Sequence, residues 1–243
     1  MADESEAIKE LLSPKNIATE DYDRVEYIQG DAFKKSNGKL AYREKHSIFY
    51  KDEKPVRVKT EYISPTGENY GEFESDYTQH PYIPNYKFLD ERFGRLEGLT
   101  WVGPKEVEVF GRKKKSSKLK KKNIKIGNKT VFAAQGFNFF FIDNIMKLQR
   151  LDEPLEVKFI IPMEGKKYSF RIRKRGESKR GLVKFRIEID NWFLRLFAPH
   201  IDLKYDTMQN RLVEYKGPSN LLNKKKQVQS VIILYKVDPS ERP

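Results

Sequence analysis

The 243-residue chain contains no cysteine and only three histidines, His46, His80 and His200. The absence of cysteine excludes disulfides, thiolate nucleophiles and cysteine-ligated zinc or iron–sulfur centres. The histidines are too widely spaced for a local metal-binding motif, so we expect no cofactor and no metal. No apolar run approaches the 18 residues that a membrane-spanning helix requires.

The motifs of common enzyme classes are absent as well. The chain has no GxGxxG or GxxxxGK[ST] phosphate loop, no GxSxG elbow and no HExxH zinc motif. Asp90 and Arg92, in an irregular segment over residues 85–100, could act as an acid–base pair. Such a cluster is more often a set of loop salt bridges, so we expect a protein without catalytic residues and keep an enzyme that uses Asp90 and Arg92 as an alternative.

The net charge of the chain is +13, and one segment, residues 112–125, contains no acidic residue at all. Residues 112–125 carry nine bases and no acid, whereas residues 1–26 carry a net charge of −5. The nine bases are Arg112, Lys113, Lys114, Lys115, Lys118, Lys120, Lys121, Lys122 and Lys125. We name residues 112–125 the basic run and predict that it lies in a mobile hairpin loop over residues 111–125.

Two interpretations of the basic run remain open. It could bind a polyanion, either nucleic acid or an anionic membrane surface. It could equally be a solvated loop whose like charges repel one another. The run lacks the interleaved aromatic residues that stack on bases, which argues against nucleic acid as a partner.

Aromatic residues are abundant, with 16 Phe, 13 Tyr and 2 Trp, and this number excludes a disordered chain. From residue 39 onward, apolar and polar residues alternate with the period of two that is typical of half-buried strands. Predicted strands span residues 39–50, 55–63, 69–77, 106–110, 124–132, 155–161, 167–173, 182–191, 201–205, 211–216 and 228–235. A single helix is predicted over residues 133–151. This pattern predicts a mainly β fold: one large antiparallel curved sheet or open barrel wrapped around one inserted helix.

Neither an internal repeat nor a linker divides the chain. We therefore expect an acidic, partly disordered or helical segment over residues 1–30, a single β-rich domain over residues 31–237, and a short tail over residues 238–243.

Two aromatic segments are candidates for an apolar binding site. The predicted helix carries Phe137, Phe140 and Phe141, and a second segment places four large apolar side chains around one arginine. The predicted ligand-binding residues are Phe137, Phe140, Phe141, Trp192, Phe193, Arg195 and Phe197. Arg195 could meet an anionic head group, although ordinary core packing explains the same pattern.

Six short segments carry a resemblance to a known family. They are residues 62–67 (YISPTG), 90–98 (DERFGRLEG), 136–140 (GFNFF), 192–199 (WFLRLFAP), 201–206 (IDLKYD) and 211–220 (RLVEYKGPSN). Together they resemble a family of uncharacterised bacterial envelope proteins that are normally made with a signal peptide. The most specific of them is the closing Tyr-x-Gly-x-Ser-Asn that precedes an Ile/Val strand. The long lysine run departs from the family pattern.

The resemblance implies a curved β-sheet around a helix, distantly similar to periplasmic lipoprotein-carrier half-barrels, and no catalytic residue. It also implies a periplasmic or envelope location, but residues 1–16 are acidic and polar and lack the pattern of a signal peptide, so a cytoplasmic location stays open. We accordingly expect a non-enzymatic envelope protein whose partner is a lipid, a lipidated protein or another apolar ligand. An anionic membrane surface is a second expected partner, through the basic run.

Overall fold

The computed structural model describes residues 22–176, 181–191 and 200–237. In these residues the chain forms a 15-stranded sheet, one α-helix and a short 3-10 helix. The first eight strands are β1 (Arg24–Lys34), β2 (Leu40–Lys51), β3 (Lys54–Ile63), β4 (Asn69–Asp76), β5 (Asn85–Asp90), β6 (Arg95–Gly103), β7 (Glu106–Arg112) and β8 (Lys120–Lys125). The later elements are β9 (Val131–Phe132), α2 (Gly136–Leu148), β10 (Leu155–Ile161), η1 (Pro162–Glu164), β11 (Lys166–Lys174), β12 (Leu182–Ile189), β13 (Ile201–Asp206), β14 (Arg211–Leu222) and β15 (Val228–Val237).

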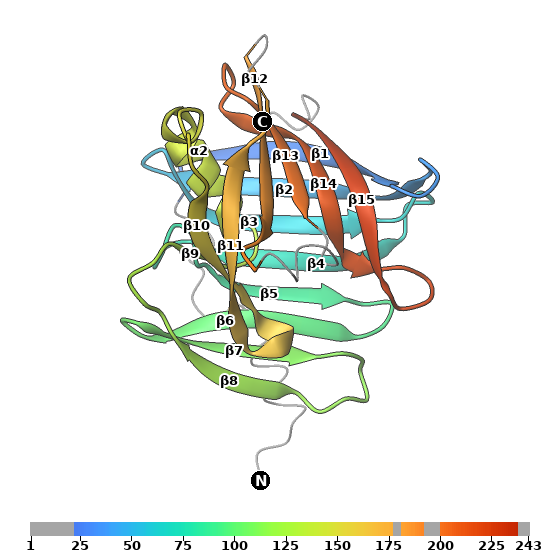
Figure 1. Cartoon of the computed structure of the whole chain (residues 1–243). Coiled ribbons are helices and arrows are strands. Elements are labelled where there is room, and N and C mark those ends of the chain that lie inside the picture. The colour runs from blue at the N-terminus through green and yellow to red at the C-terminus, as the bar shows by residue number, and fades with distance from the viewer. Residues whose placement is uncertain (1–21, 177–180, 192–199, 238–243) are drawn as a thin grey trace.

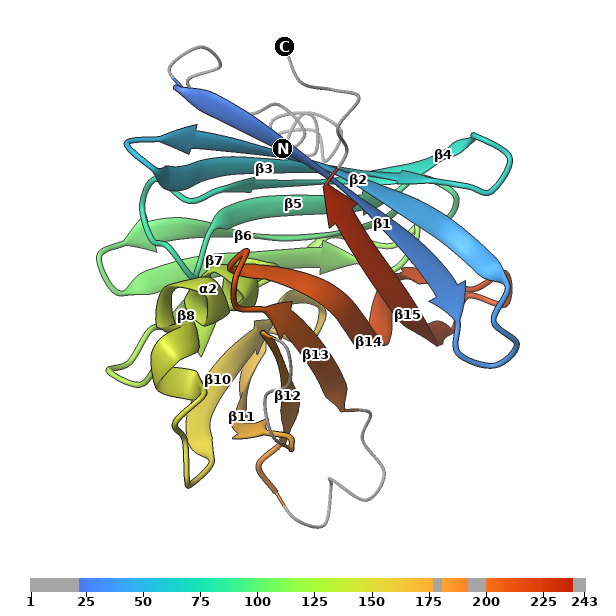
Figure 2. The same ribbon diagram turned by 90° about the horizontal axis from the view of Figure 1, so that it is seen from above.

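The first and last strands of the sheet lie side by side in its centre. From β1 the chain steps outward strand by strand to the edge strand β8, crosses to the opposite edge at β9, and steps back to β15. Neighbouring strands are antiparallel except for β9 and β10, which are parallel. Figures 1 and 2 show β2–β8 as one wall and β10–β14 as a second wall folded over it, with α2 between the two.

The hairpin of β10 and β11 approaches the edge formed by β7 and β8 without strand pairing. Lys167, in β11, donates a hydrogen bond from Nζ to the backbone carbonyl of Lys125 in β8. The hairpin turn at η1 places Met163 against Gly111 of β7. The sheet is therefore a curved, open barrel, and the predicted mainly β fold class with one inserted helix is confirmed.

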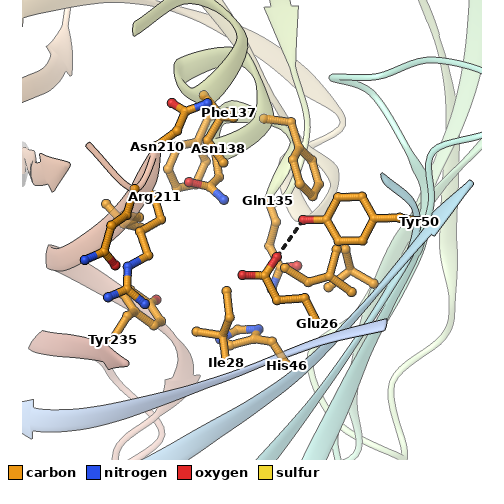
Figure 3. Close-up of a pocket in the computed structure, with 16 residues that line it drawn as sticks. Glu26, Ile28, His46, Tyr50, Gln135, Phe137, Asn138, Asn210, Arg211 and Tyr235 are labelled. Carbon is orange, nitrogen blue, oxygen red and sulfur yellow. Dashed lines mark hydrogen bonds between the residues drawn. The ribbon is translucent and has the colours of Figure 1, made fainter. Parts of the chain in front are cut away.

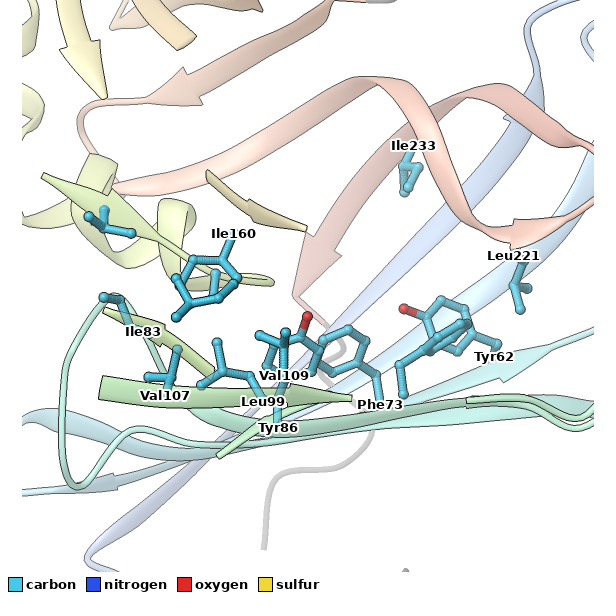
Figure 4. Packing of buried hydrophobic residues seen from close by; sticks show 14 of the residues in the cluster. Tyr62, Phe73, Ile83, Tyr86, Leu99, Val107, Val109, Ile160, Leu221 and Ile233 are labelled. Carbon is cyan, nitrogen blue, oxygen red and sulfur yellow. The ribbon is translucent and has the colours of Figure 1, made fainter. Parts of the chain in front are cut away.

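Alternating side chains of the strands build the core on the concave face. In β3, Val58, Thr60 and Tyr62 are buried while the charged residues between them are not. The largest cluster of the concave face includes Tyr62, Phe73, Ile83, Tyr86, Leu99, Val107, Val109, Ile160, Leu221 and Ile233 (Figure 4). Because the two walls face each other, one cluster takes side chains from strands far apart in the sequence.

Helix α2 fills the space between the walls with its aromatic side chains. Phe141 stacks on Tyr205 of β13 with ring centroids 5.3 Å apart, and Phe139 meets the Tyr77 ring edge-on at 4.7 Å. The helix is three residues shorter at each end than the predicted 133–151. Ala134 adopts a left-handed backbone with φ of 52°, so the right-handed helix begins only after it, at Gly136.

Strands β1, β5 and β6 lie where no strand was predicted. The strand β1 begins at Arg24, inside the segment 1–30 that was expected to precede the domain. Its inward face carries Glu26, Gly30 and Ala32 beside one large apolar residue, Ile28, so the alternation that reveals a strand is weak. Strands β5 and β6 lie in the segment 85–100 that was predicted to be irregular, and their alternation is interrupted by Asp90 and Glu97, whose charged side chains point inward.

The basic run is only partly a loop, which corrects the predicted hairpin loop over 111–125. Residues 113–119 connect β7 to β8, but Lys120–Lys125 is the edge strand β8 itself. The predicted strand over 124–132 is likewise split between β8 and β9, on opposite edges of the sheet. The sequence pattern missed β8 because only Ile124 faces inward and its other residues are exposed. Lysine on an edge strand hinders pairing with a second sheet.

Candidate functional site

A cavity of about 310 Å³ lies between the two walls of the sheet, next to α2. Its lining comes from β1–β3, from α2 with the residue before it, from the start of β14 with the turn that precedes it, and from β15 (Figure 3). The apolar part of the lining is Ile28, Ile48, Val58, Phe137, Phe139, Ile142 and Leu212. The polar part is Glu26, His46, Tyr50, Gln135, Asn138, Gln209, Asn210, Arg211 and Tyr235. The volume falls at the lower end of the range for small-molecule sites.

The imidazole of His46 has a hydrogen-bond partner at each ring nitrogen. Its Nε2 lies 3.1 Å from Oε2 of Glu44, and its Nδ1 lies 2.8 Å from Oγ1 of Thr60. Tyr235 donates to the same Glu44 oxygen at 3.1 Å, and Gln135 donates from Nε2 to Thr60 at 3.2 Å. These five residues form a polar network at the wall of the cavity.

The donors of this polar network can be assigned along one consistent direction. The Glu44 carboxylate can only accept, so Nε2 of His46 carries a proton. The Thr60 oxygen already accepts from Gln135, and its own O–H can then donate to Nδ1 of His46. Every member is satisfied in this arrangement, which allows Glu44 to be buried at 5% exposure beside an apolar core. The network thereby fixes the orientation of the His46 ring that faces the cavity.

The order carboxylate, imidazole, hydroxyl is also that of hydrolase triads, but here the hydroxyl is out of reach of a substrate. Thr60 has no exposed surface and does not line the cavity. The ring is also reversed, because Nδ1 rather than Nε2 faces the hydroxyl. The geometry supports a positioning role for these groups in the wall of the cavity.

Close contact between two strands holds Tyr235 in this wall. A Cβ atom placed on Gly30 of β1 would lie 2.7 Å from Cε1 of Tyr235, so only glycine lets the ring pack against β1. Burial, and next the negative charge of Glu44, raise the pKa of the Tyr235 hydroxyl well above its ordinary value. Tyr235 therefore stays a hydrogen-bond donor to Glu44 at any ordinary pH.

Two opposite charges face each other across the cavity, Glu26 on β1 and Arg211 at the start of β14 (Figure 3). Glu26 has its own partners, since Tyr50 donates to its Oε2 at 2.9 Å and Arg24 lies 3.7 Å away. Arg211 makes no ion pair among the described residues, and its buried Nε has no hydrogen-bond partner there. The two residues thus differ in their partners: Glu26 has a hydrogen bond and a neighbouring cation, whereas Arg211 has neither an ion pair nor a partner for its Nε among the described residues.

The structure separates the residues predicted to bind a ligand. Phe137 lines the cavity, whereas Phe140 and Phe141 do not and belong instead to the core between α2 and the second wall. Phe141 lies between Tyr205 and Phe185 and has no exposed surface. The remaining candidates, Trp192, Phe193, Arg195 and Phe197, lie outside the described residues.

The Asp90/Arg92 segment forms structural ion pairs in the fold. Arg92 donates to both carboxylate oxygens of the fully buried Asp90, at 2.9 and 2.6 Å, and to the carbonyl of Leu222 at 3.0 Å. Arg95 donates to Glu97 at 3.0 Å and to the carbonyl of Asn220 at 2.8 Å. Burial raises the pKa of Glu97 although Arg95 opposes this. Both arginines therefore tie β5 and β6 to the end of β14.

Most residues of the cavity escaped the sequence analysis. One signal was available: in the strand containing Glu44 and His46, both residues share the inward face with Ile48, and such polar side chains at inward positions are unusual. Glu26, Arg211 and Tyr235 have no such signal, because they meet only through the folding of the two walls.

Neither a metal site nor a membrane-spanning helix is found where the structure describes the chain. The described residues contain no group of three or more His, Asp or Glu side chains that could hold a metal ion. Over the same residues, no helix combines the length and the apolar character needed to cross a bilayer.

Comparisons with known proteins give one remote likeness. No family model matches the sequence, and no curated protein matches it. Among solved structures, a β-barrel-like protein of a domain of unknown function, DUF1849, from Brucella abortus aligns with a TM-score of 0.40 and 5% identity. The alignment covers 90% of this chain and 100% of that chain. A likeness this remote supports no assignment of function, and the resemblance to lipoprotein carriers stays a prediction.

Proposed function

We propose that this protein is a non-enzymatic binding protein of the bacterial cell envelope that holds a lipid, a lipidated partner or another apolar ligand in its concave sheet. The observation that carries the proposal is the cavity of about 310 Å³ between the two walls. The envelope location in this proposal rests on the sequence resemblance alone.

The lining of the cavity supports an apolar ligand. Ile28, Ile48 and Val58 form one side, and Phe139 and Ile142 of α2 form the other. Apolar surface that a ligand covers is removed from water, which contributes roughly 25 cal/mol per Å² of buried area. The polar network around His46 is internally satisfied, so it needs no ligand to complete it.

Native mass spectrometry of the protein purified gently from a bacterial host, followed by organic extraction, tests the proposal. Ile142→Trp places a larger side chain in the cavity and narrows it, and Met146→Trp is its matched control, one helical turn further on and 62% exposed. We expect the wild type and Met146→Trp to retain a bound mass or, after extraction, to bind naphthalene, a neutral apolar probe small enough for the cavity. Ile142→Trp should retain less of the bound mass and bind the probe more weakly. The proposal fails if the wild type binds neither, or if Ile142→Trp behaves as the wild type does.

A second candidate function, binding of a polyanion, is supported by the exposure of the basic run. All eight of its lysines are exposed, and among the described residues only Lys121 makes an ion pair, with Glu108. Binding driven by phosphate contacts should weaken steeply between low and moderate salt. Deletion of residues 113–118 should then reduce binding to anionic vesicles, and unchanged binding would remove this candidate.

A further inference from the structure

We propose that the cavity takes a single-chain carboxylate of about ten carbons, with its carboxylate on Arg211 and its hydrocarbon chain between β1–β3 and α2. This inference rests on the proposed function and deepens it, because it names the class of ligand and the residue that recognises its head group.

The size of the cavity limits the ligand. An engineered apolar cavity of about 150 Å³ holds benzene, so a cavity of about 310 Å³ has room for about a dozen non-hydrogen atoms. A saturated carboxylate with ten carbons has about that number. A lipid with two long acyl chains is far larger, so only part of its hydrocarbon would lie in this half-open cavity.

The sign of the ligand's head group follows from the different partners of Glu26 and Arg211. Glu26 already faces Arg24 and accepts from Tyr50, so it has no need of a cationic ligand. Arg211 has a buried Nε without a partner among the described residues. Arg211 also lines the cavity without an ion pair among the described residues, so its guanidinium can gain free energy from an incoming carboxylate. An anionic head group is therefore favoured at Arg211 and repelled at Glu26.

The local backbone keeps Arg211 available. Asp206 is its cross-strand neighbour in the hairpin of β13 and β14 and is the nearest acid by register. Its Oδ1 instead accepts hydrogen bonds from the backbone N–H groups of Met208 and Gln209 at 2.9 and 3.1 Å. Asn210, with φ of 49°, completes this turn. The turn thus engages one oxygen of the Asp206 carboxylate, and Arg211 lines the cavity without an ion pair to Asp206.

A guanidinium suits a carboxylate because its planar N–H groups match two carboxylate oxygens. The apolar residues Phe139 and Ile142 then meet the chain rather than the head group. An alcohol of the same length could bury the same hydrocarbon but would lack the charge. The affinity difference between the two ligands measures the head-group contact.

Isothermal titration of the full chain, stripped of ligand, with decanoate and decanol tests the inference. We expect decanoate to bind with one-to-one stoichiometry and at least about 10-fold more tightly than decanol. Arg211→Gln should weaken decanoate by about 10- to 100-fold and leave decanol unchanged, and Arg211→Lys should fall between. The matched control is Arg43→Gln, which removes an arginine paired with Asp31 outside the cavity.

Two results would overturn the inference, and they differ in what they imply for the proposed function. Equal binding of decanoate and decanol, or an Arg211→Gln variant as tight as the wild type, rejects the anionic head group and leaves the apolar site standing. Binding of neither ligand by the wild type rejects the inference, while the Ile142→Trp comparison decides the proposed function separately. Arg211→Gln should fold, because it removes an unsatisfied buried donor, and circular dichroism verifies this.

Discussion

Asn220 donates a hydrogen bond from Nδ2 to the hydroxyl of Tyr62 at 3.0 Å, although 158 positions separate the two residues. Beside it, the hydroxyl groups of Ser219 and Tyr42 lie 2.7 Å apart. Both contacts join an irregular part of β14, where its register with β15 shifts, to β2 and β3 in the opposite wall. The Tyr-x-Gly-x-Ser-Asn motif therefore braces the two walls that enclose the cavity.

The contact between Tyr42 and Ser219 gives the first prediction. Tyr42→Phe should lower the free energy of unfolding by about 1–2 kcal/mol, because the buried hydroxyl of Ser219 loses its Tyr42 partner. Tyr22→Phe, at a position 41% exposed, should change it by less than about 0.5 kcal/mol. Urea unfolding measures both. A double-mutant cycle with Ser219→Ala isolates the pair, and strictly additive effects would contradict the proposed bracing contact.

The close packing of Gly30 under Tyr235 gives the second. Gly30→Ala should destabilise the fold by about 1–3 kcal/mol, because the added methyl group displaces the Tyr235 ring. It should also weaken ligand binding, since Tyr235 lines the cavity and donates to Glu44. Gly127→Ala is the control, because a methyl group there meets nothing within 4 Å. If the two variants unfold at the same urea concentration, the close contact has no energetic importance.

The turn at His80 predicts a dependence of stability on pH. Nδ1 of His80 accepts from the backbone N–H groups of Tyr82 and Ile83, at 3.0 and 3.1 Å, and its ring stacks on Trp101. Burial lowers the pKa of His80 below its ordinary value of 6.5. The unfolded chain therefore takes up a proton first, and stability falls as the pH drops from about 6.5 toward the folded-state pKa.

A substitution isolates this contribution from the other titrating groups. His80→Asn keeps a side-chain acceptor for the backbone but does not titrate. The wild type should lose stability relative to this variant as the pH falls from 7.5 to 5.5, measured as the difference in their free energies of unfolding. A difference that stays constant over this range would show that His80 does not carry the effect.

The edge position of β8 predicts that part of the basic run hinders self-association through this edge. Lys120→Thr combined with Lys122→Thr should promote self-association, because it turns an exposed lysine-rich edge into one that can pair. Lys113→Thr combined with Lys115→Thr removes the same charge from the connecting loop and should leave the protein monomeric. Size-exclusion chromatography with light scattering compares the two. Equal association of both pairs would assign the effect to net charge rather than to the edge.

Elements whose signals lie within a few neighbouring residues could be predicted from the sequence. The strands near Val56–Tyr62 and Val183–Ile187 show clean alternation, so both were predicted. The aromatic helix around Phe137 was predicted because its signals are local in the sequence: the spacing of its aromatic residues and the Pro154 that follows it. Where inward positions carry Gly30, Asp90 or Glu97, the alternation is masked, and β1, β5 and β6 were missed.

By itself, the sequence determined the mainly β class, the helix inserted near Phe137 and the absence of cysteine chemistry, because each depends on composition or on neighbours a few residues apart. Only the tertiary structure decided where a ligand could bind. Pairing of β1 with β15 and the placement of α2 between the walls bring Glu26, His46, Ile142 and Arg211 to one cavity. No periodicity in the chain encodes such a meeting, since it follows from the curvature of the whole sheet and from long-range contacts such as that between Tyr62 and Asn220.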